Sequence, residues 1–329
     1  MGRVAFFFPG QGSQSVGMGR AIAAAFPAAA AVFAEADAVL GEPLSRMAWE
    51  GPAHELDRTV NAQPAILAAA IATLVALRER WGDGGVTVSP AFDAGHSMGQ
   101  YPAMVAAGSI SLADGLRLVR ERGRQMQAAG AGRAGAMVAI MGLDDACLAE
   151  LVRRAALVGI FGVANRNAPG QVVVSGERPA VEASIEIARE LGARKTVLLP
   201  VSVAAHSPLM AEAAKGMAEV IRDIPFADPQ PPLVSNADGH LIVDAAGARA
   251  ELVNHLTVGV DWVTAVRGMA RTGVDVFLEV GPGRVLTGLI KRIEPEAWAI
   301  ASNDPTAASG LATAALELNP ATFAARLGR

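Results

Sequence analysis

The chain has 329 residues, of which 52% are hydrophobic and 18% are charged, and its formal net charge at pH 7 is −4. This composition predicts a folded, core-rich protein and excludes a largely disordered one. The charge balance gives no electrostatic reason to expect binding to nucleic acid or to an anionic membrane. Cys147 is the only cysteine. An intrachain disulfide is therefore excluded, and we expect a reducing, cytoplasmic location.

The N-terminal apolar run, residues 4–8, is too short for a signal peptide and ends at Pro9-Gly10. We expect no apolar run to reach the roughly 20 residues that a membrane helix needs. The alanine-rich tracts at residues 21–36 and 65–77 are instead predicted to be packed helices. The five histidines lack the paired spacing of a zinc site, so neither a metal nor a cofactor is expected.

Strands and helices alternate along the first part of the chain. A buried strand is predicted at residues 4–8, a helix at about 21–39, and a long helix at about 64–80 with Pro64 in its first turn. A second strand at residues 91–96 leads into a helix at 98–107. This alternation predicts a mostly parallel sheet, with the site at the carboxyl ends of its strands.

The pattern changes from Gly135 onward. Strands are predicted at residues 136–143, 159–165, 171–175 and 193–199, and helices at 144–156 (with Asp144 as cap) and 179–191. The order β-α-β-β-α-β is that of a ferredoxin-like unit. The main sheet then resumes with strands at about 233–236, 274–280 and 297–302. From Asp304 we expect a polar, partly helical tail.

Residues 95–99 spell Gly-x-Ser-x-Gly, the pattern of a nucleophile elbow. A strand turns sharply into a helix there, so only small residues fit two positions before and two after Ser97. The turn would expose the Ser97 hydroxyl and place the Met98 amide beside an oxyanion formed on it. Taken alone the pattern is weak, because a glycine-bracketed turn with an idle serine gives the same letters.

These elements predict an α/β protein. Its α/β-hydrolase-like core, with a mostly parallel sheet, comprises residues 1–130 and 201–329, and a ferredoxin-like subdomain is inserted at residues 131–200.

Arg122 stands out in the helix predicted at residues 112–129. At about 100° per residue it lies at the edge of the buried stripe, whereas Arg117, Arg120 and Arg124 point away from it. A buried guanidinium is costly unless it meets an anion, which favours an anionic ligand. The alternative is that its methylenes pack and its head group reaches water. Helical periodicity leaves both interpretations open.

Seven motifs occur in collinear order, at residues 8–14, 61–64, 95–99, 122–126, 167–171, 206–210 and 279–283. Over residues 4–293 the chain resembles the malonyl-CoA:acyl-carrier-protein transacylases, the acyltransferases of fatty-acid and polyketide synthesis. The resemblance implies that Ser97 is the nucleophile and that His206 is its base. It further implies that Arg122 clamps the malonyl carboxylate, and that the Gln11 and Met98 amides form the oxyanion hole.

The resemblance also places Gln63, Asn254 and His255 at the substrate pocket, and it implies that backbone carbonyls near Asn254-His255 hold the histidine in place of an acid. Three residues depart from the family pattern. Gln100 stands where glutamate is usual, and His255 where glutamine is frequent. Ala205 stands where malonyl-selective members often carry a larger residue, so strict malonyl selectivity is not implied.

The expected activity is transfer of a malonyl group from malonyl-CoA, through a Ser97 acyl-enzyme, to the phosphopantetheine thiol of acyl carrier protein, by a cytoplasmic monomer. One competing hypothesis is a thioesterase-like hydrolase that shares Ser97 and His206 but has little use for Arg122. A second is transfer of a different acyl group such as methylmalonyl, and a third is a non-catalytic subunit that docks carrier protein.

Overall fold

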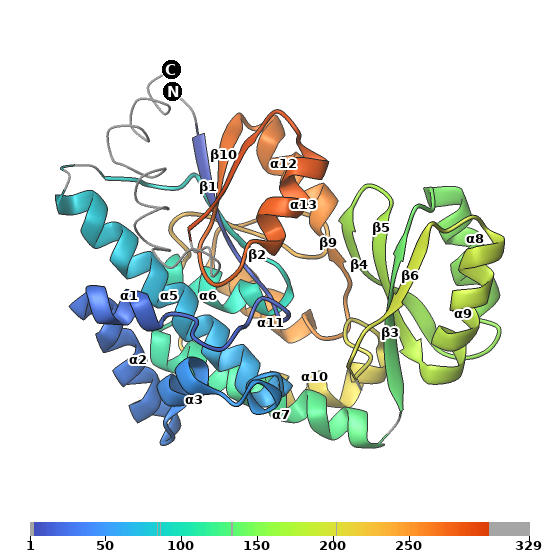
Figure 1. The fold of residues 1–329 in the computed structure, drawn as a ribbon, viewed down its shortest axis with the longest axis horizontal. Helices are drawn as coiled ribbons and strands as arrows, with labels where there is room; N and C mark the ends of the chain where they lie inside the picture. The colour runs from blue at the N-terminus through green and yellow to red at the C-terminus, as the bar shows by residue number, and fades with distance from the viewer. Residues whose placement is uncertain (1–2, 84, 86, 133, 202, 303–329) are drawn as a thin grey trace.

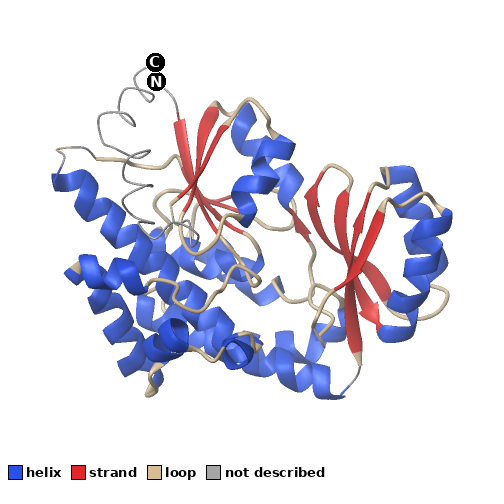
Figure 2. Cartoon of the chain, viewed as in Figure 1, coloured by secondary structure: helices blue, strands red, loops and turns tan. Residues whose placement is uncertain are grey.

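The computed structural model describes residues 3–83, 85, 87–132, 134–201 and 203–302. The tail predicted from Asp304 lies outside the described residues. Two sheets, each with its own helices, lie side by side (Figures 1 and 2). The larger sheet has six strands in the order β11 (Trp298–Ala301), β10 (Val274–Glu279), β1 (Arg3–Phe8), β2 (Phe92–Gly95), β7 (Leu233–Val234) and β8 (Leu241–Ile242).

Every pairing in the larger sheet is parallel except that of β7 with β8, so the predicted mostly parallel sheet is confirmed. Both of its faces are buried, as a parallel sheet requires. Along β1, Phe6 and Phe8 belong to the apolar cluster on one face, and Ala5 and Phe7 to the cluster on the other.

Eleven helices belong to the larger unit within the described residues: α1 (Arg20–Ala25), α2 (Pro27–Leu40), α3 (Leu44–Glu50), α4 (Ala53–Leu56), α5 (Thr59–Asp83), α6 (Gln100–Ala106), α7 (Leu112–Gly132), α10 (Ala211–Arg222), α11 (Ala245–Asn254), α12 (Trp262–Arg271) and α13 (Val285–Ile293). The single helix predicted at residues 21–39 is wrong. Phe26 is extended, and Pro27 begins a second helix because proline disfavours helical backbone in the residue before it.

Helix α5 differs from its prediction in two respects. It begins at Thr59, and Pro64 lies inside it, because the backbone already turns at Arg58, whose carbonyl accepts from the Asn61 and Ala62 amides. By length and composition α5 could also span a membrane, which contradicts the expectation that no run is long enough. Of its most apolar stretch, 89% is buried inside the molecule, so α5 is packed as a core helix here.

The smaller sheet has five strands in the order β6 (Lys195–Leu198), β3 (Gly135–Met141), β5 (Gln171–Glu177), β4 (Phe161–Ala168) and β9 (Val260–Asp261). With α8 (Asp145–Ala155) and α9 (Arg178–Glu190) on one face, the predicted β-α-β-β-α-β order is confirmed (Figure 1). Asp144 caps α8 as expected, accepting from the Cys147 amide at 2.8 Å. Strand β9 comes from outside residues 131–200, and those domain boundaries stay a prediction.

Candidate active site

Ser97 lies at the carboxyl end of β2, in a short 3₁₀ turn (Ser97–Gly99) that leads into α6. Its φ is 51°, in the left-handed region that non-glycine residues rarely adopt. A Cβ on Gly95 would lie 1.9 Å from the Gly99 carbonyl carbon, and one on Gly99 would lie 2.1 Å from the Phe8 carbonyl oxygen. Glycine is therefore required on both sides of the serine, and the elbow predicted from the sequence is present.

His206 is brought to Ser97 from the other half of the chain. Its Nε2 lies 2.8 Å from the Ser97 Oγ, and its Nδ1 lies 2.8 Å from the Val258 carbonyl oxygen. Because the carbonyl only accepts, Nδ1 carries the proton, and Nε2 is free to accept the serine hydroxyl proton. His206 has a φ of 59° and is, with Ser97, one of two non-glycine residues in the described chain with positive φ. Such strain concentrates at functional sites.

The environment of His206 keeps the imidazole neutral. Burial, together with the positive charge of Arg122, lowers the pKa of His206 to about 3. A neutral imidazole at physiological pH is the form that can accept a proton from Ser97.

Arg122 is buried, with 1% of its surface exposed, so the interpretation that its head group reaches water is wrong. One guanidinium nitrogen donates to Gln63 Oε1 at 2.9 Å, and the other lies 3.4 Å from the Ser97 Oγ. The guanidinium also lies 6.0 Å from the centre of the Tyr101 ring, a cation–π distance. Its Nε has no hydrogen-bond partner, and no carboxylate of the described residues pairs with it.

The loop after β1 packs directly on the elbow. Gly10 makes this possible, since a Cβ there would lie 2.5 Å from the His96 carbonyl oxygen. Gln11 follows Gly10 in this loop, and Met98 follows His96 by two residues in the elbow. The Gln11 side chain donates to Thr59 Oγ1 at 3.1 Å. An oxyanion hole made by the Gln11 and Met98 backbone amides stays a prediction.

His255 follows α11 and is 3% exposed. Its ring stands perpendicular to that of His206 at 5.8 Å and lies 5.8 Å from the Tyr101 ring. It rests against the Ser97 backbone, but neither ring nitrogen completes a hydrogen bond with the described residues. Burial and the charge of Arg122 lower the pKa of His255 well below its usual value, so this second imidazole is also neutral.

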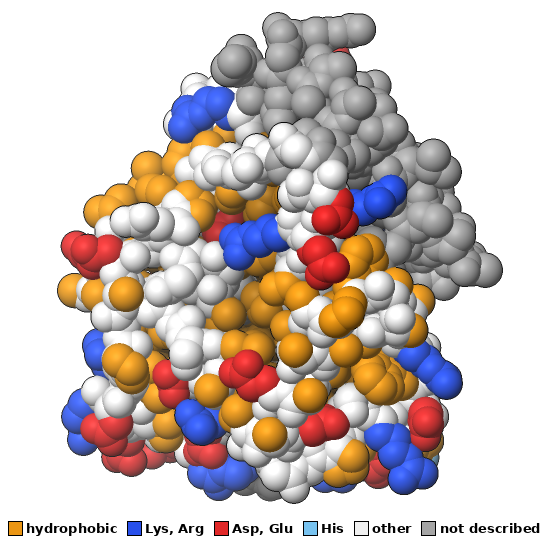
Figure 3. All heavy atoms as spheres, turned by 90° about the vertical axis from the view of Figure 1, so that its left-hand side faces the viewer, with side chains coloured by type: hydrophobic (Ala, Val, Ile, Leu, Met, Phe, Trp, Pro, Cys, Tyr) orange, Lys and Arg blue, Asp and Glu red, His pale blue; other side chains and the backbone are white. Residues whose placement is uncertain are grey.

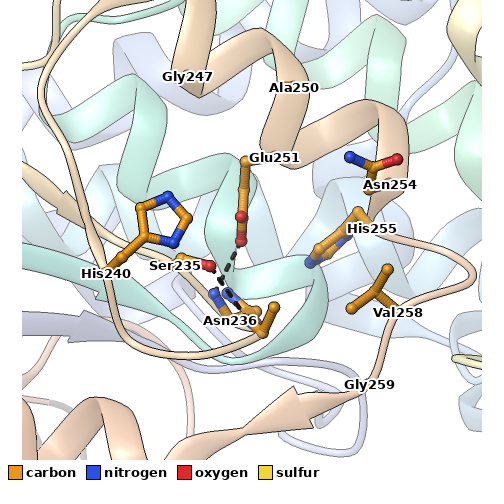
Figure 4. A pocket seen from close by; sticks show the side chains of 11 residues that line it. Ser235, Asn236, His240, Gly247, Ala250, Glu251, Asn254, His255, Val258 and Gly259 are labelled. Atoms are coloured by element: carbon orange, nitrogen blue, oxygen red, sulfur yellow. Dashed lines mark hydrogen bonds between the residues drawn. The ribbon is translucent and has the colours of Figure 1, made fainter.

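The two other predicted pocket residues, Gln63 and Asn254, differ in burial. Gln63 is fully buried and contacts Arg122. Asn254 is exposed, and it lines a cavity of about 200 Å³ that His255 and Val258 also line (Figure 4). Its backbone carbonyl accepts from the Val258 amide at 3.1 Å, which fixes the turn whose Val258 carbonyl holds His206. The supporting carbonyl thus lies three residues after His255, near the Asn254-His255 segment where the resemblance places it.

Sequence reasoning missed two contacts of the elbow. The Asn236 side chain accepts from the Ser97 amide at 2.8 Å. His96 Nε2 lies 2.8 Å from Asn167 Oδ1, which joins the elbow to β4 of the smaller sheet. Asn236 had a usable signal, since a polar residue at the carboxyl end of a strand beside β2 faces the site.

The comparisons with known proteins agree with this geometry. The family model for the acyl transferase domain matches residues 5–306, and the chain belongs to this family. It is 44% identical over 313 residues to a malonyl CoA-acyl carrier protein transacylase of Salmonella typhimurium, covering 95% of this chain and 100% of the relative.

Solved structures show the same fold. The acyl-carrier-protein S-malonyltransferase of Bartonella henselae superposes with a TM-score of 0.87 at 40% identity, covering 97% of this chain and 100% of that one. A malonyl-transacylase in complex with its type II polyketide synthase acyl-carrier protein superposes with a TM-score of 0.86 at 41% identity, covering 95% and 98%.

Proposed function

We propose that this protein transfers a malonyl group from malonyl-CoA, through an ester on Ser97, to the phosphopantetheine thiol of acyl carrier protein in fatty-acid or polyketide biosynthesis. The observation that carries the substrate class is Arg122, a buried cation without a carboxylate partner, 3.4 Å from the Ser97 Oγ. A free carboxylate on the acyl group would supply the missing anion. The names of the relatives support the same donor and acceptor.

In the first half-reaction His206 Nε2 accepts the hydroxyl proton as the Ser97 Oγ attacks the thioester carbonyl carbon. The thioester carbonyl oxygen becomes an oxyanion, and hydrogen bonds from the Gln11 and Met98 backbone amides stabilise it. The carbon–sulfur bond then breaks, and the coenzyme A thiolate takes the proton from His206. In the second half the carrier thiol gives its proton to His206, its sulfur attacks the ester, and the Ser97 oxygen recovers the proton.

The second half-reaction favours a thiol over water as the acceptor. The Val258 carbonyl orients the imidazole without adding a negative charge to the site. A thiol, whose pKa is about 8.5, gives its proton to that imidazole far more readily than water, whose pKa is about 15.7. The acyl-enzyme is thereby spared from water until the carrier arrives.

Intact mass after mixing with malonyl-CoA tests the proposal. A stable malonyl adduct on Ser97 that disappears on addition of holo carrier protein supports the transferase, whereas release of coenzyme A without adduct or acceptor supports the hydrolase. Competition between malonyl-, methylmalonyl- and acetyl-CoA then defines the acyl group, which the small, buried Ala205 beside His206 leaves open.

Replacing Arg122 with alanine should reduce malonyl transfer by roughly ten- to a hundredfold. A hydrogen bond to a charged partner contributes about 1.5–3 kcal/mol, and a bidentate pair between a guanidinium and a carboxylate can exceed this. Acetyl transfer never uses the guanidinium and should be spared. The measurement is the malonyl-to-acetyl ratio of kcat/KM in wild type and variant.

Arg124→Ala is the matched control for this ratio. Arg124 lies on the same helix, but it is exposed and pairs with Glu121 at 2.6 Å, so its loss should leave both substrates unaffected. An unchanged ratio in Arg122→Ala would mean that Arg122 does not bind the malonyl carboxylate. The assignment of malonyl as the acyl group would then be wrong.

Carrier protein is acidic as a class, so we expect a basic docking face. Two clusters qualify by sequence: Arg189, Arg194 and Lys195 on the smaller unit, and Arg284, Lys291 and Arg292 near the glycine loop. Two members already have partners: Arg189 pairs with Glu186 at 2.6 Å, and Arg292 bonds to Gln171 and to the Pro169 carbonyl. On the face drawn in Figure 3, basic and acidic side chains are interspersed.

The exposed Lys195 and Lys291 are the sharpest probes. The double charge reversal Lys195→Glu/Lys291→Glu should raise the KM for carrier protein several-fold without changing kcat, and the effect should shrink at high salt. Lys215→Glu is the control, since Lys215 pairs with Glu212 on α10, outside both clusters. An unchanged KM would eliminate both clusters as the docking face.

A further inference from the structure

The side-chain amide of Asn236 spans the elbow. Its Oδ1 accepts from the Ser97 amide at 2.8 Å, and its Nδ2 donates to the Gly95 carbonyl at 2.8 Å. Strand β7 pairs with β2 only at Asp93 and Ala94, so the ladder ends just before the elbow. The Asn236 side chain continues the pairing at the residues that the strand no longer reaches.

Asn236 is itself held on every side. Its backbone amide donates to Glu251 Oε1 at 2.8 Å, and its carbonyl accepts from the Asp261 amide at 2.7 Å. Only 4% of its surface is exposed. All four of its hydrogen-bonding groups are thus engaged, and the side chain has no freedom to rotate away from the elbow.

A second amide completes the arrangement. Gln100 Oε1 accepts from the Gly95 amide at 2.9 Å, and its Nε2 donates to the Val234 carbonyl at 3.1 Å. The same nitrogen lies 3.4 Å from Glu251 Oε1. This one carboxylate oxygen therefore accepts from both the Gln100 side-chain amide and the Asn236 backbone amide. Figure 4 shows Glu251 descending from α11 onto Asn236. Glutamine suits this position because an ionised glutamate could not donate to the Val234 carbonyl.

The elbow needs such support because its backbone is strained. A left-handed conformation at a non-glycine residue costs on the order of 1–2 kcal/mol and persists only when its surroundings enforce it. Relaxation of φ at Ser97 would swing its Oγ away from His206 Nε2, now 2.8 Å distant. Catalytic geometry tolerates little error of this kind, since a displacement of about 1 Å can cost about a hundredfold in rate.

We propose that Asn236, supported by Glu251, is a positioning residue that holds Ser97 in its reactive conformation. The proposal depends on the proposed function only for the identity of the acyl donor. It assigns to Asn236 no contact with the substrate.

The direct test is Asn236→Ala. Its rate of Ser97 acylation by malonyl-CoA, per folded molecule, should fall roughly ten- to a hundredfold, while the half-saturating concentration of malonyl-CoA stays near that of wild type. Ser109→Ala is the control: it removes another buried side-chain bond, 2.9 Å to the Ala227 carbonyl, and should lower the melting temperature without slowing acylation. Normal acylation in Asn236→Ala, with only a lower melting temperature, would overturn the proposal.

Glu251 provides the rescue experiment. Glu251→Gln keeps an oxygen that accepts from the Asn236 amide and should acylate at close to the wild-type rate, whereas Glu251→Ala should share the defect of Asn236→Ala. Burial raises the pKa of Glu251, which fits a role that does not require charge. Equal defects in Glu251→Gln and Glu251→Ala would show that the carboxylate acts in another way, and would overturn its part in the proposal.

A fluorophosphonate probe separates this proposal from the proposed function, because it reports the reactivity of Ser97 with no acyl donor involved. Slower labelling of Asn236→Ala, in a protein whose wild type does not accept malonyl from coenzyme A, would keep the positioning role and reject the malonyl assignment. Equal labelling of Asn236→Ala and wild type would reject the positioning role alone.

Discussion

Ser97→Ala is expected to abolish acyl-enzyme formation completely. The substitution removes the only atom that can carry the ester, and the base 2.8 Å away then has no hydroxyl to activate. The fold should persist, because the elbow is held by the Ser97 backbone amide and by glycine contacts that the variant keeps. Intact mass after incubation with malonyl-CoA should show no added malonyl group.

Two control measurements on Ser97→Ala test whether the variant is folded and binds its substrate. The melting temperature of Ser97→Ala should stay close to that of wild type, because only one oxygen is lost. Binding of malonyl-CoA should also survive, since Arg122 and its Gln63 contact are untouched. A malonyl adduct on the variant would mean that another side chain is the nucleophile.

His206→Ala is expected to lower transfer by about a thousandfold or more. The base takes part in both half-reactions, and members of a catalytic unit act together, so the double variant with Ser97→Ala should be no worse than Ser97→Ala alone. The steady-state rate of transfer to holo carrier protein measures the loss. Near-normal turnover would remove His206 from the mechanism.

The pH profile supplies an independent check on this base. A histidine with its ordinary pKa of about 6.5 would lose its basic form as pH falls through that value. Burial and Arg122 hold the pKa of His206 at about 3, so kcat/KM for acylation should stay flat well below pH 6.5. In Arg122→Ala one of these causes is gone, the pKa of His206 rises, and the acid limb should move to higher pH. A half-maximal point near 6.5 in wild type would contradict the burial of this base.

The local parts of the site could be predicted because they depend on residues close in sequence. The sharp turn around Ser97 requires glycine at positions 95 and 99, so the five-residue motif was enough to predict the elbow. The burial of Arg122 was left open because periodicity places it only at the edge of a stripe. Arg122 is buried because the neighbouring Gly123 lets α7 approach α5 closely. A Cβ on Gly123 would lie 2.6 Å from the Val60 Cα.

Other parts of the site depend on contacts between segments that are far apart in the sequence. The acceptor for His206 is a backbone carbonyl, and every residue carries one, so no side chain marks Val258. The contact of Asn236 with Ser97 joins residues 139 positions apart and depends on β7 lying beside β2. The division of the helix predicted at residues 21–39 could have been anticipated from Pro27, whose effect on the residue before it is local.

The pairing of β9 with β4 has a consequence for any attempt to shorten the chain. Val258 lies just before β9, whose only neighbour in the smaller sheet is β4. Excising residues 131–200 would remove that neighbour, and the segment that carries Val258 would be left with its bonds to Asn254 and Asn236. We expect a chain shortened in this way to keep its nucleophile but to hold its base less firmly. The smaller sheet would then contribute to catalysis through the alignment of His206, although it supplies neither the nucleophile nor the base.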